Sequence, residues 1–308
     1  MKIQLLTILI PVYNESDCLQ ILYERLQLLS EKLSCAVQIL FVNDGSTDDT
    51  LLKIKEFQEK DNRITFVDLS RNYGKEIALS AGIDYTKGDA LVIIDADLQD
   101  PPELIPEMLL GIEEGYDDVY AQRTNRKGET WLKRFSSKVY YKWMEKLSDI
   151  PIQKDTGDFR MFSSRAISAI KQIQEKERNM KGLFSYIGLR KKVIYYERDA
   201  RIAGSTKWNY WQLFQLAIKG LTSFSIIPLR IVSLIGSIVS FSAFVYLIKV
   251  LTKALLYGDE VAGYPSLMST LLFVSGVILL ALGVMGEYIG IIYKETKNRP
   301  LYFINEIG

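Results

Sequence analysis

The sequence predicts an α/β domain with a mostly parallel sheet, followed by helices of a membrane type. In residues 1–125, apolar runs that suit strands alternate with stretches of helical spacing, a pattern typical of parallel sheets covered on both faces. After about residue 208 the apolar content rises. Ile231–Ile248 and Leu267–Gly286 then carry no charge, and each is long enough to span a bilayer.

The strands of the α/β domain are expected at five apolar runs: LLTILIPV, VQILFV, ITFVDL, ALVIID and DDVYAQ. Helical spacing covers residues 16–33, starts again at Ser46–Asp49, and returns at 75–86 and 102–114. The first four strands end in the polar clusters YNES, NDGS, SRNYG and DADLQD. Because ligands of such sheets bind at the carboxyl ends of the strands, we expect these clusters to converge on one edge.

Two further stretches have the composition of helices that lie in a membrane interface. Residues 131–147 combine an apolar face with Trp, Tyr and a row of lysines, although an ordinary surface helix fits that helix alone equally well. Residues 208–227 carry only one charge, Lys219. We therefore expect a globular domain at 1–207, an interfacial helix at 208–229, and a two-helix membrane domain with a short C-terminal tail at 230–308.

The flanking cations predict how the two spans are oriented. Positive residues lie before the first span and after the second, at Lys207, Lys219, Arg230, Lys294, Lys297 and Arg299. The loop between the spans has fewer, so the globular domain and the C-terminus are expected on the cytoplasmic side of the plasma membrane. Glycines in and after the spans allow close helix packing, which is compatible with a homo-oligomer.

Composition excludes several classes of chemistry. The net charge is +1, so no overall field favours nucleic acid. The chain has no histidine, which rules out His-dependent triads and His-ligated zinc. Its two cysteines, Cys18 and Cys35, lack metal-binding spacing and are expected to be reduced thiols. The chemistry must therefore use Asp, Glu, Lys, Arg, Tyr or a metal bound by oxygen.

The motif DADLQD follows a buried strand with several acids. Asp95 and Asp97 are one residue apart, so on extended backbone they face the same side, and Gln99 adds an amide oxygen. Hard oxygen ligands suit Mg²⁺ or Mn²⁺, the ions that hold nucleotide phosphates. A capped turn into the helix after Pro101 is the plainer alternative, and we interpret Asp100 as that cap.

Two other strand ends offer nucleotide contacts. In FVNDGSTDDT, Gly45 permits a tight turn, and Asp44 suits a base or ribose hydroxyl better than a phosphate, which it would repel. In PVYNES, Glu15 lies at the same predicted edge of the sheet. For the FVNDGSTDDT motif an ordinary turn between a strand and a helix remains the alternative.

The motifs PVYNE, VNDGSTDDT and DADLQDPPE together resemble those of inverting family-2 glycosyltransferases with the GT-A fold. The subgroup most similar is the polyprenyl-phosphate glycosyltransferases, relatives of dolichyl-phosphate mannose synthase, which include bacterial O-antigen-type bactoprenol glucosyltransferases. GDFRMF, RIAGSTKW and the two apolar segments extend the resemblance over nearly the whole chain.

The resemblance implies roles for individual residues. On the donor side, Asp44 would contact the nucleoside, and Asp95, Asp97 and Gln99 would hold Mg²⁺ or Mn²⁺, with Asp95 also close to the nucleotide-sugar. The remaining donor-side residues would line the nucleotide pocket or close over the diphosphate: Pro11, Tyr13, Glu15, Arg201, Ser205 and Lys207.

On the acceptor side, the resemblance places Arg123 and Arg134 near the acceptor phosphate. Asp158, in DTGDFRMF, is the position expected for a general base. A lipid phosphate is already ionised near neutral pH, with a second pKa of roughly 6, so Asp158 could instead orient the acceptor or the metal.

The expected reaction is inverting transfer of one sugar from a nucleotide-sugar to undecaprenyl phosphate at the bilayer surface, for modification of cell-envelope glycans such as lipopolysaccharide. UDP-glucose is the first choice of donor, and GDP-mannose or a modified UDP-pentose remain open. A processive polysaccharide synthase would need a QxxRW-like element, which the sequence lacks. A non-enzymatic membrane scaffold would be expected to have lost the acids, and here all are present.

Overall fold

The computed structural model describes residues 2–124, 156–173, 175–176, 178–196, 227–257 and 263–308. The described residues form two units, which we treat separately. An α/β unit contains the residues up to 196 together with Arg299–Gly308, and a helical unit contains residues 227–298. The helix expected at 131–147 lies outside the described residues, as do residues 208–226 of the helix expected at 208–229.

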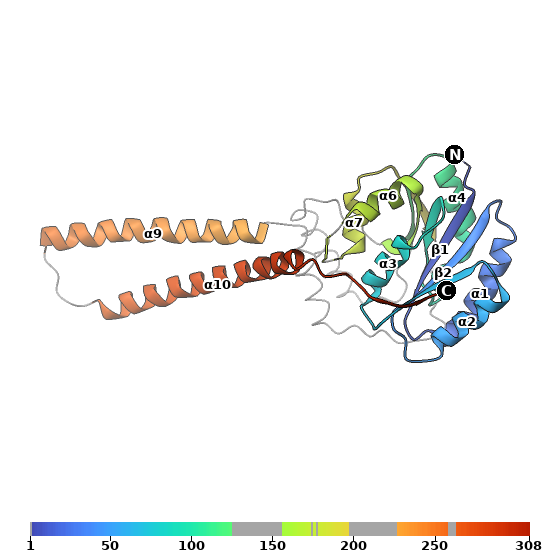
Figure 1. The fold of residues 1–308 in the computed structure, drawn as a ribbon. Coiled ribbons are helices and arrows are strands. Elements are labelled where there is room, and N and C mark those ends of the chain that lie inside the picture. The colour runs from blue at the N-terminus through green and yellow to red at the C-terminus, as the bar shows by residue number, and fades with distance from the viewer. Residues whose placement is uncertain (1, 125–155, 174, 177, 197–226, 258–262) are drawn as a thin grey trace. The chain divides into compact units, whose positions relative to one another are not determined.

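The α/β unit is built on an eight-stranded sheet with the order β7-β5-β6-β4-β1-β2-β3-β8 (Figure 1). The strands are β1 (Leu5–Val12), β2 (Ala36–Asn43), β3 (Ile64–Leu69), β4 (Ala90–Ile93), β5 (Asp118–Arg123), β6 (Thr156–Ser163), β7 (Lys191–Tyr196) and β8 (Ile304–Ile307). β4, β1, β2 and β3 are parallel neighbours, β5 and β7 are parallel, and β6 and β8 run antiparallel to their neighbours. The predicted α/β fold with a mostly parallel sheet is confirmed.

Helices cover both faces of this sheet (Figure 1). They are α1 (Ser16–Ser30), α2 (Thr50–Lys60), α3 (Lys75–Asp84), the short 3-10 helix η1 (Pro102–Leu104), α4 (Ile105–Glu113), α6 (Ser164–Gln172) and α7 (Met180–Tyr186). α1, α2 and α4 pack on one face, and α3 and α6 pack on the other. The chain therefore has the layered architecture that continuous apolar strands require.

Strand β1 shows how the sequence produces the two layers. Ile8 and Ile10 are fully buried in the cluster that also holds Leu19 and Leu22 of α1. Leu9, between them, points to the opposite face, where a Cβ on Gly82 of α3 would lie only 2.1 Å from its methyl carbon. Each such buried side chain contributes about 1.5–3 kcal/mol to folding. The alternation thus anchors β1 between both helix layers.

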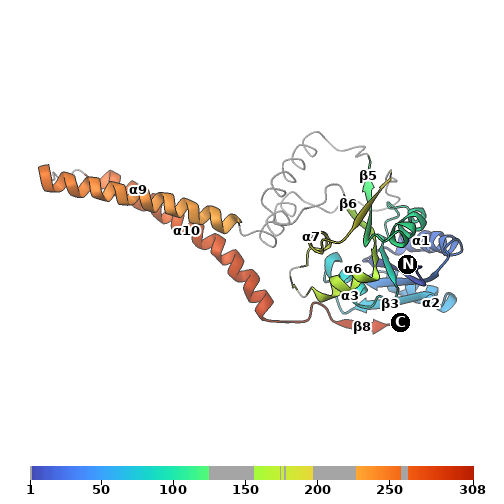
Figure 2. The ribbon, with the colours of Figure 1, turned by 90° about the horizontal axis from the view of Figure 1, so that it is seen from above.

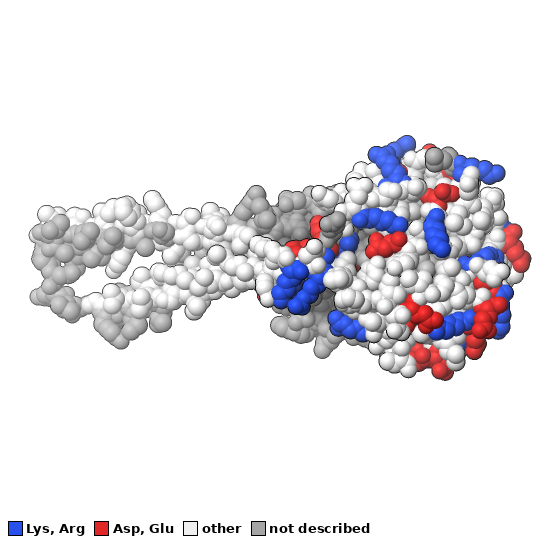
Figure 3. Space-filling view, in the orientation of Figure 1, with Lys and Arg blue, Asp and Glu red and all other residues white. Residues whose placement is uncertain are grey.

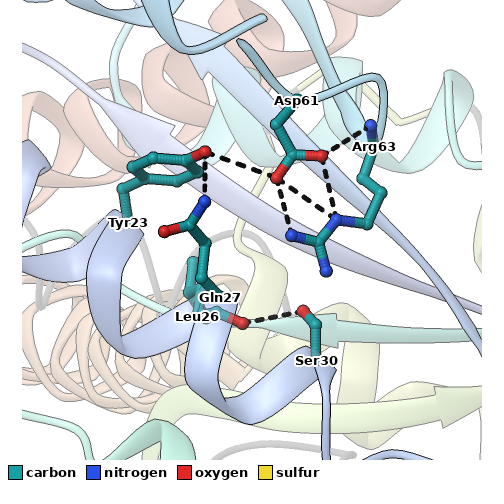
Figure 4. Close-up of polar contacts among 6 residues, drawn as sticks. All are labelled: Tyr23, Leu26, Gln27, Ser30, Asp61 and Arg63. Atoms are coloured by element: carbon teal, nitrogen blue, oxygen red, sulfur yellow. Dashed lines mark hydrogen bonds and ion pairs between the residues drawn. The ribbon is translucent and has the colours of Figure 1, made fainter.

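A polar network lies at the end of the sheet where β3 begins (Figure 4). Arg63 binds Asp61 through Nη2 and Nε, at 2.7 and 2.9 Å. Tyr23 of α1 donates its hydroxyl to the same carboxylate at 3.5 Å, and Gln27 donates to that hydroxyl. The hydrogen bond from Arg63 lowers the pKa of Asp61 more than burial raises it. This network joins α1 to the start of β3.

The last residues of the sequence return to the α/β unit as a strand that the patterning did not predict. Figure 2 shows β8 lying beside β3 at the edge of the sheet. Phe66 and Gly308 exchange backbone hydrogen bonds of 3.1 and 3.0 Å, and Ser70 donates its N–H to Phe303 at 2.9 Å. The tail after the second long helix is therefore part of the sheet.

The helical unit consists of α9 (Ile227–Tyr257) and α10 (Tyr264–Thr296), which pack against each other. Large apolar side chains along both helices are exposed, and in the view of Figure 3 the described surface is uncharged along most of their length, with charges near the end of α10. Among the described residues, one stretch, Phe273–Thr296, is long and apolar enough to cross a membrane, whereas Ile231–Tyr246 is apolar but shorter. The expectation of two spans is therefore not confirmed.

Glycines do not mediate the packing of these two helices. A Cβ added at any of the expected packing glycines would meet no atom within 4 Å: Gly236, Gly276, Gly283, Gly286 and Gly290. In the described part of the helical unit, these positions face open space.

Candidate active site

The polar clusters at the carboxyl ends of the parallel strands converge, as predicted. The loop after β1 and the loop after β2 are joined by hydrogen bonds. Asn14 donates its N–H to Ser46 Oγ at 3.0 Å and accepts the Thr47 N–H at 2.8 Å. Glu15 donates its N–H to Thr50 Oγ1 at 3.0 Å. These bonds hold two of the four clusters in one fixed arrangement.

Asp44, the predicted nucleoside contact, directly follows β2. Its side chain is bound by the loop after β3. Asp44 is 3% exposed, and its carboxylate accepts the N–H groups of Tyr73 and Gly74 at 2.7 and 2.8 Å. Burial raises the pKa of Asp44, while the two backbone donors act in the opposite direction. The Asp44 side chain is therefore oriented by Tyr73 and Gly74, four and five positions after the end of the neighbouring strand β3.

Backbone conformations that side chains disfavour gather at this edge. Gly45 has φ +66°, and a Cβ there would lie 2.4 Å from the Arg71 carbonyl carbon, so no other residue fits without moving the loop after β3. Two non-glycine residues, Asn14 and Leu98, have φ values of 54° and 59°. Such strain persists only where the surrounding structure enforces it, and it clusters at functional sites.

A lysine supplies the positive charge beside the acids that follow β4. Lys75 Nζ lies 2.6 Å from an oxygen of Asp95 and 2.6 Å from an oxygen of Asp158. Burial opposes the charge of Lys75, but the two carboxylates outweigh burial and raise its pKa. Burial likewise opposes the charge of Asp158, and Lys75 and Lys181 lower its pKa overall. Both partners of the Lys75–Asp158 pair are therefore held ionised.

The residues expected to hold a metal offer oxygen atoms of the right kind. Asp95 and Asp97 follow β4 two positions apart, and Asp97 accepts the Gln99 N–H at 3.2 Å. Gln99 is 8% exposed, and its side-chain oxygen has no hydrogen-bond partner among the described residues. Among all the residues that the structure describes, no three His, Cys, Asp or Glu side chains gather as a metal cluster. Two carboxylates with one unused amide oxygen nevertheless fit a hard divalent cation.

The predicted acceptor residue Arg123 lies at the end of β5, near Asp158. Its Nε donates to the Tyr196 hydroxyl at 3.4 Å. A Cβ on Gly157, the residue before Asp158, would lie 3.5 Å from Arg123 Nη2. The structure therefore brings Arg123 and Asp158 to neighbouring positions.

The remaining predicted residues divide into two groups. Pro11 pairs with Val42 in the sheet, Tyr13 is partly exposed directly after β1, and Glu15 occupies the N-cap position of α1. Their contacts with a nucleotide stay predictions. Four other predicted residues lie outside the described residues: Arg134, Arg201, Ser205 and Lys207.

One prediction from the DADLQD motif, the role of Asp100, is wrong. Asp100 does not cap the next helix, because the N-cap position of η1 is Pro101 and no side chain caps it. Asp100 is instead buried and accepts a hydrogen bond from the Tyr196 hydroxyl. Burial and the neighbouring Asp100 raise the pKa of Tyr196 to about 12. Tertiary pairing with β7, which the patterning did not predict, explains the error.

With this geometry in place, the comparison with known families is decisive. The family described as glycosyl transferase family 2 matches residues 7–171, which include every motif of the converging edge and Asp158. The chain belongs to glycosyl transferase family 2. The predicted family is confirmed, and the protein is a glycosyltransferase.

This glycosyltransferase has full-length relatives. An uncharacterized glycosyltransferase of Synechocystis sp. is 47% identical over 302 residues, covering 98% of this chain and 95% of the relative. A prophage bactoprenol glucosyl transferase homolog of Escherichia coli is 40% identical over 302 residues, covering 98% and 99%. The bactoprenol glucosyl transferase of Shigella phage SfX is 40% identical over 299 residues, covering 97% and 98%.

Solved structures resemble the glycosyltransferase at lower identity. Mannosyl-3-phosphoglycerate synthase from Rubrobacter xylanophilus is 17% identical with a TM-score of 0.48, covering 70% of this chain and 71% of that chain. Residues 1–349 of TarS from S. aureus are 15% identical with a TM-score of 0.43, covering 62% and 60%.

Two side chains of the glycosyltransferase site escaped the sequence analysis. Lys75 directly follows the SRNYG cluster, so its place after a strand end was an available signal. Tyr196 ends a strand of mixed composition, KKVIYY, and had no such signal. Both lie next to acids from distant parts of the chain, at Asp95, Asp158 and Asp100.

Proposed function

We propose that this glycosyltransferase moves a single glucose from UDP-glucose to undecaprenyl phosphate, with inversion at the sugar C1. The observation that carries the proposal is the 40% identity, over nearly the full length of both chains, to proteins named bactoprenol glucosyl transferases. The similarity covers the apolar helices as well as the α/β unit. It therefore includes the part of the chain suited to a lipid acceptor.

The converging edge supplies the groups that such a transfer needs. Asp44 would bind the nucleoside, at the position where the 71–74 loop orients it. In the reaction, a phosphate oxygen of the acceptor forms a bond to C1 as the bond from C1 to the diphosphate breaks, and UDP leaves. One displacement of this kind inverts the configuration at C1.

Asp158 and Arg123 would act on the acceptor. The acceptor phosphate is largely ionised at neutral pH, with a second pKa of roughly 6, so it needs little help to lose a proton. We therefore assign Asp158, held ionised by Lys75, to orienting the acceptor and the sugar. Arg123, beside Gly157, offers the paired donors that bind phosphate.

Asp95, Asp97 and Gln99 would hold Mg²⁺ or Mn²⁺. Such an ion would offset the charge that develops on the leaving diphosphate. The Gln99 oxygen, which has no partner in the part of the chain that the structure describes, supports this role, because a buried acceptor without a partner destabilises the fold unless a ligand uses it.

The two long helices would bring the enzyme to its lipid substrate. We propose that α9 and α10 both span the plasma membrane and that the α/β unit lies on its cytoplasmic face. In α10 the Phe273–Thr296 stretch has a mean hydropathy of 1.9, and none of it is buried inside the protein. The helix expected at 131–147, within the domain expected at 1–207, and the helix expected at 208–229 would both lie at headgroup depth.

The test is a donor screen with the full chain in detergent or vesicles. UDP-glucose, GDP-mannose and UDP-pentoses are each offered with undecaprenyl phosphate and Mg²⁺ or Mn²⁺, and the lipid products are identified by mass. We expect a monoglucosyl lipid from UDP-glucose, lost when the metal is chelated. A product from another donor would overturn the choice of glucose, and a polymer would indicate a processive synthase.

A binding measurement separates failure of chemistry from failure of the site. Metal-dependent binding of UDP should be lost in Asp95→Ala and retained in Glu59→Ala, which removes an exposed acid of α2. If no donor gives a lipid product, the proposed reaction is wrong. If Asp95→Ala binds UDP with metal as the unaltered chain does, the assignment of the metal site is wrong.

A further inference from the structure

One side chain of strand β8, that of Asn305, contacts strand β3, which precedes the loop that orients Asp44. Asn305 donates its amide N–H to Asp68 Oδ2 at 2.9 Å. Asp68 is 4% exposed, and its other oxygen accepts from the Asn43 amide at 2.6 Å. A residue more than 230 positions away in the chain therefore completes the hydrogen bonding of a buried carboxylate in β3.

The bond from Asn43 to Asp68 sets the orientation of the Asn43 amide. An amide has one donating and one accepting end, and Asp68 accepts from the donating end. The accepting end is thereby turned toward the Ser46 N–H, which donates to it at 3.3 Å. If the amide were reversed, its NH₂ would face the Ser46 N–H, donor against donor. Asp68 thus stabilises the turn that contains Asp44.

A backbone contact of the same segment supports Asp44 from its other side. Ser70 donates its N–H to Phe303 at 2.9 Å, and the Ser70 and Tyr73 hydroxyls lie 3.0 Å apart. The Tyr73 N–H in turn binds Asp44. The segment from Phe303 to Asn305 therefore contacts the loop after β3 directly through Ser70, and it reaches the turn after β2 indirectly, through Asp68 and Asn43.

We infer that Asn305 is a positioning residue for the donor nucleotide, acting through Asp68 and Asn43 on the turn that holds Asp44. The inference rests on the proposed function in one respect, that Asp44 binds the nucleoside. Only eight residues lie between Thr296, at the end of α10, and Asn305. The chain that leaves the proposed membrane helix thus forms part of the donor site.

The test compares Asn305→Ala with Glu306→Ala in the full chain. Glu306 is the next residue of the same strand and pairs with Lys55 on the surface. We expect Asn305→Ala to raise KM for UDP-glucose and the Kd for UDP roughly five- to tenfold, the effect of losing about one hydrogen bond. We expect kcat to stay within about twofold, because the substitution leaves the reacting groups in place.

Exchanging the carboxylate and the amide between positions 68 and 305 should restore UDP binding in part. Asp68→Asn alone should weaken UDP binding, because position 68 then accepts fewer bonds. In the double variant Asp68→Asn with Asn305→Asp, the amide oxygen at position 68 accepts from Asn43 and its NH₂ donates to the new carboxylate. We expect the double variant to bind UDP more tightly than Asp68→Asn alone.

Two outcomes would overturn the inference. One is an unchanged KM and Kd in Asn305→Ala. The other is a loss of Tm and kcat with KM unchanged, since that result describes a strand with a purely structural role. The Kd for UDP needs no lipid acceptor, so it judges the inference even if the unaltered chain forms no glycolipid and the proposed reaction fails.

Discussion

At the scale of single residues, one ammonium group separates two carboxylates that the proposed transfer uses. Lys75 lies 2.6 Å from both Asp95, which follows β4, and Asp158 of β6. Without it, the two acids would face each other with no described cation in contact. Asp95 is therefore compensated within the protein by the lysine that begins α3, before any metal is considered.

We predict that Lys75→Met lowers kcat/KM on the order of 10- to 100-fold, because one of two neighbouring acids then becomes protonated or moves away. The side chain of Lys75 is 40% exposed, so solvent screens part of the effect. The measurement is steady-state transfer from UDP-glucose at pH 7. Lys75→Arg keeps the charge and should retain more activity. Equal activity in Lys75→Met and the unaltered chain would contradict a role for this charge.

At the scale of elements, the two ends of the parallel strands have different roles. The edge at the carboxyl ends carries the site, whereas the edge where β3 begins carries the Tyr23–Gln27–Asp61–Arg63 network (Figure 4). The network contains no residue of the converging clusters. We therefore assign it to stability alone.

We predict that Asp61→Asn lowers the free energy of unfolding at pH 7 by about 2 kcal/mol, through loss of the charged bonds from Arg63. Arg63 holds the pKa of Asp61 below its unfolded value. Stability from this pair is therefore fully present above the unfolded value of about 3.9 and is lost as pH falls through the folded pKa.

The measurement is urea unfolding of the full chain in detergent, followed by circular dichroism at pH 7 and at steps down to pH 3. The difference between Asp61→Asn and the unaltered chain should shrink below about pH 4. Asp49→Asn, an exposed acid whose side chain caps nothing, should have little effect at any pH. A difference that is the same at all pH values would show that charge is not the cause.

Element prediction succeeded where strands were continuous and apolar and failed where they were mixed. The five predicted strands lie at β1 to β5, within two residues at each end. β6 was missed because TGDFRMFS carries Asp158 and Arg160 in a strand. Arg160 is almost fully buried, binds Asp118 of β5 at 3.2 Å and lies over the ring of Phe184, so partners from other elements make its burial tolerable.

At the scale of the whole molecule, charge and apolar surface are divided between the two units. In the view of Figure 3, charged side chains gather on the α/β unit and at the end of α10, whereas most of the length of α9 and α10 is uncharged. Leu279 of α10 is 69% exposed, and Leu110 of α4 is 58% exposed. In water these leucines would be equivalent, whereas in a bilayer only the first would contact lipid.

We predict that Leu279→Arg reduces the fraction of the chain that resists alkaline extraction from membranes, while Leu110→Arg does not. Arginine in the centre of a spanning helix costs about 2.5–3.5 kcal/mol on insertion scales. Both variants add the same charge to an exposed apolar position, so their difference reports the surroundings of α10. Equal extraction of the two variants would contradict a membrane span at Phe273–Thr296.

The sequence by itself determined the α/β architecture, the edge that carries the site and the family, because these depend on local periodicity and on motifs contiguous in the chain. It placed Asp44, Asp95 and Asp97 at one edge, whereas the position of Asp158 beside them, in the unpredicted strand β6, came from the structure. Only the tertiary structure decided the partners of those acids. Lys75 reaches Asp158, Tyr196 reaches Asp100, and Asn305 reaches Asp68 across 83, 96 and 237 positions, respectively. Pairings at such separations follow from strand order, which local patterning does not encode.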